Sequence, residues 1–126
     1  MRPRWLLGVA LATGAFGIAT VASGGRVLFG PEAVRAAAGR VVPFVLWFNF
    51  LAGFAYLAAA VGLWRGRRWA APLSWAIAAA TALMFVAFGI HVLRGGAFEP
   101  RTVVAMTLRT AFWAAIAVAV WRRPLR

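Results

Sequence analysis

Residues 41–93, VVPFVLWFNFLAGFAYLAAAVGLWRGRRWAAPLSWAIAAATALMFVAFGIHVL, contain two long apolar runs separated by a few basic residues. The runs cover 41–64 and 69–93, and Arg65-Gly66-Arg67-Arg68 connects them. Each run is about as long as the ~20 residues that an α-helix needs to cross a ~30 Å hydrocarbon core. A connection this short makes the two helices antiparallel neighbours. The segment therefore predicts a transmembrane helical hairpin.

The rest of the chain has the same apolar character. Of its 126 residues 64% are hydrophobic and 13% charged, with a mean hydropathy of +0.85. A soluble domain is about half apolar and a quarter charged, and disorder needs low hydrophobicity, so both classes are excluded. Further apolar runs cover 5–23 and 102–121, and they lack the alternating polarity of β-barrel strands. We expect one all-α membrane domain over 1–126, a four-helix antiparallel bundle.

The first run needs a separate decision, because its flanks are also typical of a secretory signal peptide. Arg2 and Arg4 precede the apolar stretch, and Val21-Ala22-Ser23 follows it. We expect the run to be kept as the first membrane span.

Arginines predict the orientation of the bundle. Short cytoplasmic loops are enriched in basic residues, and the ends of the chain with the second connection carry eight: Arg2, Arg4, Arg65, Arg67, Arg68, Arg122, Arg123 and Arg126. The opposite side has five, together with both acidic residues: Arg26, Arg35, Arg40, Arg94, Arg101, Glu32 and Glu99. Both termini are therefore predicted to be cytoplasmic. Four tryptophans at that boundary agree with this placement: Trp5, Trp64, Trp69 and Trp121.

The first connection is the only long one, and it predicts a short helix over 31–38 on the outer face. Pro31 and Glu32 suit the start of a helix, and Gly39 suits its end. In the third connection, Gly95 can end the third span and Pro100 can open the fourth.

Polar residues inside the spans indicate the bundle interior, since a buried polar group in lipid needs a protein partner or water. Arg109 lies about seven residues below the outer end of the last span, which is roughly 10 Å. An arginine at the centre of a span costs about 2.5–3.5 kcal/mol on insertion scales, so it should face the interior and be paired. We predict an outward-opening pocket that holds Arg109, His91 and Asn49. Candidate partners and neighbours are Glu99 or Glu32 at its mouth, and Tyr56 on the same polar face as Asn49.

Two interpretations of this cluster stay open. Arg109 can be structural, either reaching outward to lipid phosphate or locking the bundle through Glu99. Alternatively, the cluster is a ligand, ion or proton site, since a histidine can exchange a proton near neutral pH.

The chain offers little for catalysis. It has no Cys, which excludes disulfides, zinc–thiolate sites and iron–sulfur ligation within the chain. One His without Asp or Cys makes a closed metal site in one chain unfavourable. His91 and Met84 lie on one side of one helix and cannot sandwich a haem iron, so a second haem ligand would come from elsewhere. No phosphate loop, carboxylate pair or Ser/His/acid set is present. The net charge of +12 favours anionic lipid over nucleic acid, because the arginines flank spans.

The hairpin resembles a known family. Asn49-Phe50-Leu51-Ala52-Gly53-Phe54-Ala55-Tyr56, then Gly62-Leu63-Trp64-Arg65 and Trp69-Ala70-Ala71, are similar to the second-to-third span junction of DoxX-like proteins. These are small four-span proteins of the bacterial inner membrane. The resemblance implies that location and a redox role with quinone. The acidic residue often found in the family's second span is absent, and Asn49 lies nearby instead. The Lys-free, Ala- and Arg-rich composition also indicates a GC-rich bacterial genome.

Three functions follow from these observations. The first is a non-enzymatic accessory or structural subunit that packs against another membrane protein or a second copy. The second is an oligomeric small-solute or ion transporter or channel that uses the Arg109, His91 and Asn49 pocket. The third is a quinone- or haem-associated redox subunit.

Overall fold

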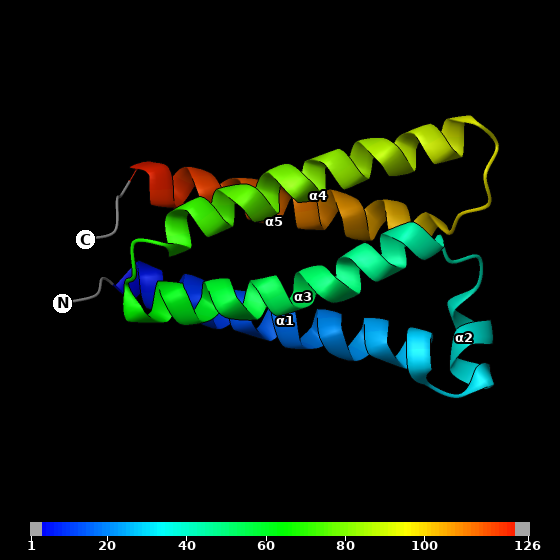
Figure 1. Ribbon diagram of the computed structural model, residues 1–126, viewed down its shortest axis with the longest axis horizontal. Helices are drawn as coiled ribbons and strands as arrows, with labels where there is room; N and C mark the ends of the chain where they lie inside the picture. Colours follow the sequence, from blue (N-terminus) through cyan, green and yellow to red (C-terminus); the bar gives the residue numbers. More distant parts are fainter. Residues whose placement is uncertain (1–3, 123–126) are drawn as a thin grey trace.

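The computed structural model describes residues 4–122 and builds them from five helices (Figure 1). Four are long and one is short: α1 (Arg4–Phe29), α2 (Glu32–Ala38), α3 (Pro43–Arg65), α4 (Ala70–Leu93) and α5 (Pro100–Arg122). Each of the four long helices is long and apolar enough to cross a membrane. The prediction of an all-helical chain with four membrane-length helices and a short helix in the first connection is therefore confirmed.

The first helix is longer than the sequence predicts. The expected span ends at Ser23, whereas α1 continues through two glycines to Phe29. Gly24 does not end the helix because it packs against α3, where a Cβ atom would lie 3.2 Å from Cβ of Phe50. Arg35 of α2 then donates hydrogen bonds to the carbonyls of Val27, at 3.2 Å, and Leu28, at 2.8 Å. These bonds satisfy carbonyl groups that the helix end leaves without a partner.

The long helices form two close pairs, α1 with α3 and α4 with α5 (Figure 1). The start of α1 and the end of α5 lie at one end of the bundle, and α2 lies at the other end with the connection between α4 and α5. The α4–α5 pair consists of consecutive helices, whereas the α1–α3 pair is set by packing, because α2 lies between α1 and α3 in the chain.

Glycines bring α1 and α3 together. A Cβ atom on Gly53 of α3 would lie 2.7 Å from Cγ2 of Val21, and one on Gly17 of α1 would lie 3.0 Å from Cδ2 of Leu57. Small residues permit such close approach of two membrane helices, where dispersion contacts replace the hydrophobic driving force.

The α3–α4 turn follows from the residue at the end of α3. Gly66 has φ 64° and ψ 32°, a left-handed conformation that glycine adopts without a steric penalty. Its N–H donates to the carbonyl of Leu63, and the N–H of Arg67 donates to that of Gly62. These are the two hydrogen bonds of a Schellman motif, so the short basic connection reverses the chain within a few residues.

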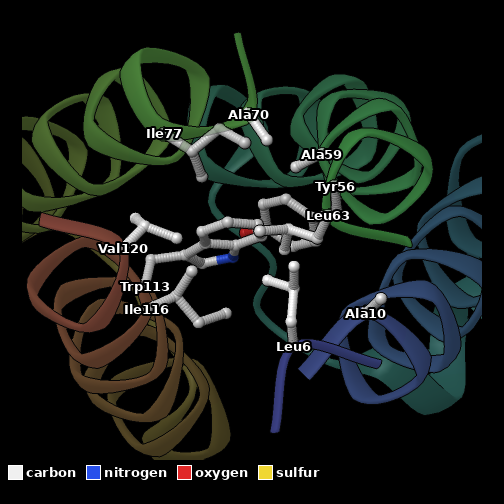
Figure 2. Packing of buried hydrophobic residues seen from close by; sticks show 10 residues of the cluster. All are labelled: Leu6, Ala10, Tyr56, Ala59, Leu63, Ala70, Ile77, Trp113, Ile116 and Val120. Carbon is white, nitrogen blue, oxygen red and sulfur yellow. The ribbon is translucent and has the colours of Figure 1, made fainter. Parts of the chain in front are cut away.

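Large side chains fill the space between the two pairs. Figure 2 shows Trp113 reaching from α5 into the centre of the bundle, beside Tyr56 of α3, and their ring centroids are 4.9 Å apart. Both are fully buried, as are Leu6 and Leu63 nearby. A second cluster toward the α2 end contains Val42, Val45, Phe88 and Met106.

The glycine contact between α1 and α3 is testable by adding one methyl group. We expect Gly53→Ala to lower the free energy of unfolding by about 1–3 kcal/mol, because the methyl group overlaps Val21 and the helices must separate. Thermal unfolding in detergent micelles, followed by circular dichroism, measures the change. Gly89→Ala is the matched control, since a Cβ atom there meets nothing within 4 Å. Equal melting temperatures for the two variants would show that the contact is unimportant.

Candidate functional site

Arg109 lies nine residues into α5, about 14 Å along its axis from Pro100. Its Nη1 donates to Oγ1 of Thr20 at 3.0 Å and to the hydroxyl of Tyr56 at 3.4 Å. Its Cζ atom also lies 5.0 Å from the ring centroid of Phe16 and 5.9 Å from that of Tyr56. Contacts of this kind attract a cation to the face of an aromatic ring. The guanidinium therefore connects α5 to both helices of the other pair.

The carboxylates predicted as partners of Arg109 have other positions. Oε1 of Glu99 accepts a hydrogen bond from the backbone N–H of Arg40 at 2.8 Å, and Glu32 is exposed on α2. Within residues 4–122, the hydrogen bonds of the Arg109 side chain go to two neutral hydroxyls. Glu99 lies outside α5, just before its first turn, which keeps its carboxylate near the end of the bundle.

Several buried polar atoms near the bundle centre have no hydrogen-bond partner in the described part of the chain. They include Nε of Arg109, Nε1 of Trp113, and the hydroxyls of Thr13 and Thr81. Buried polar groups nearly always find a partner, whether protein or ordered water. Their positions on α1, α4 and α5 show that the interior is polar below Arg109 as well as beside it.

Asn49 occupies a different place, on the floor of a cavity at the α2 end of the bundle. Its Nδ2 donates to Sδ of Met106 at 3.6 Å, and its Oδ1 is buried and has no hydrogen-bond partner among the described residues. The cavity has a volume of about 290 Å³ and lies between α1, α3 and α5. Glu99 and Asn49 both line it, whereas Arg109 and His91 do not. Arg109 follows the lining residue Ala105 by one helical turn and lies beneath the cavity.

His91 lies apart from the Arg109 contacts and from the cavity that Asn49 lines, and it contacts the connection between α4 and α5. Its Nε2 is 2.9 Å from the carbonyl oxygen of Ala97, and its ring packs edge-on against Phe44 at 5.9 Å. The glycine at 96 leaves room for this ring, since a Cβ atom there would overlap it. The predicted meeting of Arg109, His91 and Asn49 in one pocket does not occur in this structure.

Two contacts, which we call the α2–α5 strap, join residues at the edge of the cavity. Arg101 donates from Nη2 to the carbonyls of Ala37 and Ala38, each at 3.2 Å, and Glu99 accepts from Arg40. Gly39, with φ 78°, lies against the Glu99 carboxylate, and a Cβ atom there would overlap Oε1. The glycine expected to end the short helix therefore also admits Glu99.

The residues that contact Arg109 were only partly expected. Tyr56 was among the predicted site residues, and the structure brings it to the guanidinium. Thr20 and Phe16 were missed as partners. Thr20 shares the small and polar face of α1 with Thr13 and Gly17, all buried; that face was the available signal for Thr20. Nothing in the sequence distinguishes Phe16 from the other phenylalanines.

In residues 4–122, no group of three or more His, Cys, Asp or Glu side chains is arranged so that it could hold a metal ion.

Comparison of the chain with known protein families, curated proteins and solved structures finds no match. The resemblance to DoxX-like proteins stays a prediction from the residues that carry it.

The Thr20 contact predicts a loss of stability without a change of charge. We expect Thr20→Val to lower the free energy of unfolding by about 1–3 kcal/mol, because a hydrogen bond to a charged group is lost and the cation stays. Thr107→Val is the control, since that exposed hydroxyl bonds the carbonyl of Val103 in its own helix. Chemical unfolding in mixed micelles measures both. In an Arg109→Met background, Thr20→Val should have little effect; an undiminished effect there would mean that Thr20 acts through packing alone.

Proposed function

We propose that this chain is a non-enzymatic accessory or structural subunit of a bacterial inner-membrane assembly. The observation that carries the proposal is the arrangement of Arg109. Its guanidinium donates hydrogen bonds to Thr20 and Tyr56 and lies over the ring of Phe16, all on the neighbouring helices. A charge held this way stabilises one arrangement of the two helix pairs, which suits a scaffold for other helices.

The outward side of α5 supports contact with a partner helix. Four exposed residues with helical spacing form what we call the α5 outer face: Thr107, Ala111, Ala114 and Ala115. Val104, Leu108 and Val118 of α5 are exposed beside these small residues, and the outward side of α3 exposes Trp47, Leu51 and Phe54. Small residues allow a second membrane helix to approach closely, so we assign the α5 outer face to a second copy or another membrane subunit.

The proposed location is the bacterial inner membrane, with both termini in the cytoplasm and anionic lipid around the arginines. The excess of arginine at the termini and in the α3–α4 connection supports this orientation. The outer cavity would then face the periplasm, together with α2 and the α2–α5 strap.

The orientation is testable because the chain has no cysteine of its own. We expect the single variant Ala97→Cys to react with a membrane-impermeant maleimide on intact spheroplasts. Arg67→Cys should react only after the membrane is opened, because the positive-inside rule places the α3–α4 connection in the cytoplasm. Labelling is read by the mass shift of the purified chain, and the opposite pattern would invert the proposed orientation.

Association through the α5 outer face is tested by adding bulk to it. In native-lipid particles prepared without detergent, we expect a mass larger than that of one 13.5 kDa chain. Ala111→Trp and Ala115→Trp should shift the particles toward the single chain, since overpacking a helix contact costs about 1–3 kcal/mol. Leu51→Trp, on the outward side of α3, is the control and should leave the mass unchanged. A wild-type chain that is monomeric at native abundance contradicts the proposal.

A second candidate function is a small-solute transporter or channel, because the cavity above Asn49 provides an entry on the predicted outer side. The structure places Arg109 one turn below that cavity and His91 outside its lining, so such a pathway would begin at Asn49. Solute flux in liposomes that is lost in Asn49→Leu would favour this function.

A further inference from the structure

A groove lies between α4 and α5 at the end of the bundle opposite α2. It has a volume of about 580 Å³ and is lined by Trp75 of α4 and by Val118, Trp121 and Arg122 of α5. The two tryptophan rings have centroids 6.1 Å apart and meet edge-on at 82°. All three apolar side chains of the lining are exposed, Trp121 most of all at 72%. The groove therefore presents a large apolar surface to the surroundings of the bundle.

The groove is apolar along its length and charged at its mouth. Trp121 and Arg122 are the last two residues of α5, whereas Trp75 lies about 7.5 Å along α4 from its first residue, Ala70. Because α4 begins and α5 ends at the same end of the bundle (Figure 1), Arg122 lies at the outer limit of the groove and Trp75 lies deeper. In a membrane, these positions correspond to the headgroup layer and the edge of the hydrocarbon layer.

Arg122 has no acidic side chain near it. Both acidic residues of the chain, Glu32 and Glu99, lie at the other end of the bundle, in α2 and in the connection before α5. Within residues 4–122, the exposed Arg122 side chain makes no hydrogen bond or ion pair. A guanidinium has five N–H donors in a planar arrangement that fits a phosphate group. The mouth of the groove therefore offers an uncompensated cation with unused donors.

We propose that the α4–α5 groove binds one anionic phospholipid. One acyl chain packs against Trp75, Val118 and Trp121, and the phosphate accepts hydrogen bonds from Arg122. The order of apolar and cationic groups along the groove matches the lipid, whose phosphate lies at the membrane surface and whose chains point inward. An engineered cavity of ~150 Å³ holds benzene, so the groove has room for a segment of an acyl chain.

This site deepens the proposed contact between the arginines and anionic lipid, and it rests only on the location of the chain in a membrane. It is the same for either orientation, because the groove and Arg122 share one end of the bundle. It does not need the α5 outer face to contact a partner. A chain that proves monomeric would contradict the proposed association and leave the lipid site to be decided by its own experiment.

Native mass spectrometry of the full chain, released from detergent micelles, measures the lipid affinity. Dioleoyl phosphatidylglycerol and dioleoyl phosphatidylcholine have the same acyl chains, but only phosphatidylglycerol has a net negative charge. Each lipid is titrated into delipidated protein, and the abundance of the complex with one lipid gives an apparent dissociation constant. We expect the wild-type chain to bind phosphatidylglycerol about five-fold more tightly than phosphatidylcholine, the effect of one arginine near an anionic lipid.

Three variants separate the groove from the general positive charge of this end. Arg122→Gln should weaken phosphatidylglycerol about five-fold and remove most of its preference. Arg68→Gln is the matched control, since Arg68 is exposed at the same end but does not line the groove, and it should leave both affinities unchanged. Trp75→Ala removes one wall and should weaken both lipids. Circular dichroism checks that each variant is folded, and the exposed Arg122 keeps the test available if Trp75→Ala does not fold.

Three results would overturn the proposal. One is equal affinity of the wild-type chain for the two lipids. Another is an equal loss of phosphatidylglycerol in Arg122→Gln and Arg68→Gln, which would mean that the lipid is attracted by net charge alone. The third is a wild-type chain that binds neither lipid and forms dimers that Trp75→Ala dissociates, which would assign the groove to a second copy. A preference that only Arg122→Gln removes, with weaker binding of both lipids in Trp75→Ala, supports the site.

Discussion

The contact on which this structure depends most is that of the Arg109 guanidinium with α1 and α3. A cation at mid-depth in a bundle of apolar helices must be solvated by the protein, since lipid tails cannot do it. Here two hydroxyl groups and two aromatic ring faces solvate the guanidinium. Because these groups come from the helix pair opposite α5, the need to solvate one charge also holds the two pairs together.

The two kinds of helix contact in the bundle have different physical origins. Within the α1–α3 pair, glycines let the backbones approach, and dispersion between closely packed atoms is the main attraction. Between the pairs, the backbones are kept apart by large rings: the ring of Tyr56 packs against those of Phe16 and Trp113 in tilted geometries, with centroids 5.4 and 4.9 Å apart. Polar atoms concentrate in this wider space, where side chains long enough to reach across can meet.

Polar groups are arranged at successive depths along the bundle. The strap formed by Glu99 and Arg101 lies at the α2 end, Asn49 forms the floor of the cavity under it, and Arg109 follows one turn deeper. The cavity lining carries one acidic and one basic side chain, Glu99 and Arg101, together with the hydroxyl side chains of Ser23 and Thr102. The Arg109 contact belongs to the framework below the cavity, since Arg109 does not line it.

Much of the architecture could be predicted from the chain alone. The long apolar runs, the Arg65–Arg68 turn and the Pro31–Gly39 segment predict the helices, because hydrophobic length, glycine and proline act locally. The end of α1 was predicted too early: Gly24 and Gly25 resemble a helix exit, and only the presence of Phe50 on α3 shows that they are a packing surface. Residue depth also grouped Asn49, His91 and Arg109 together, since depth along a helix says nothing about the direction in which a side chain points.

The sequence by itself therefore determined that this is a chain of four membrane-length helices with one arginine that needs partners. Only the tertiary structure decided which partners those are. Helix length and polarity are properties of single segments, whereas the neighbours of Arg109 depend on how α1, α3 and α5 rotate and pair. That pairing placed Thr20 and Tyr56 at the guanidinium and turned His91 to its own connection at Ala97. It also buried the amide oxygen of Asn49 without a hydrogen-bond partner in residues 4–122.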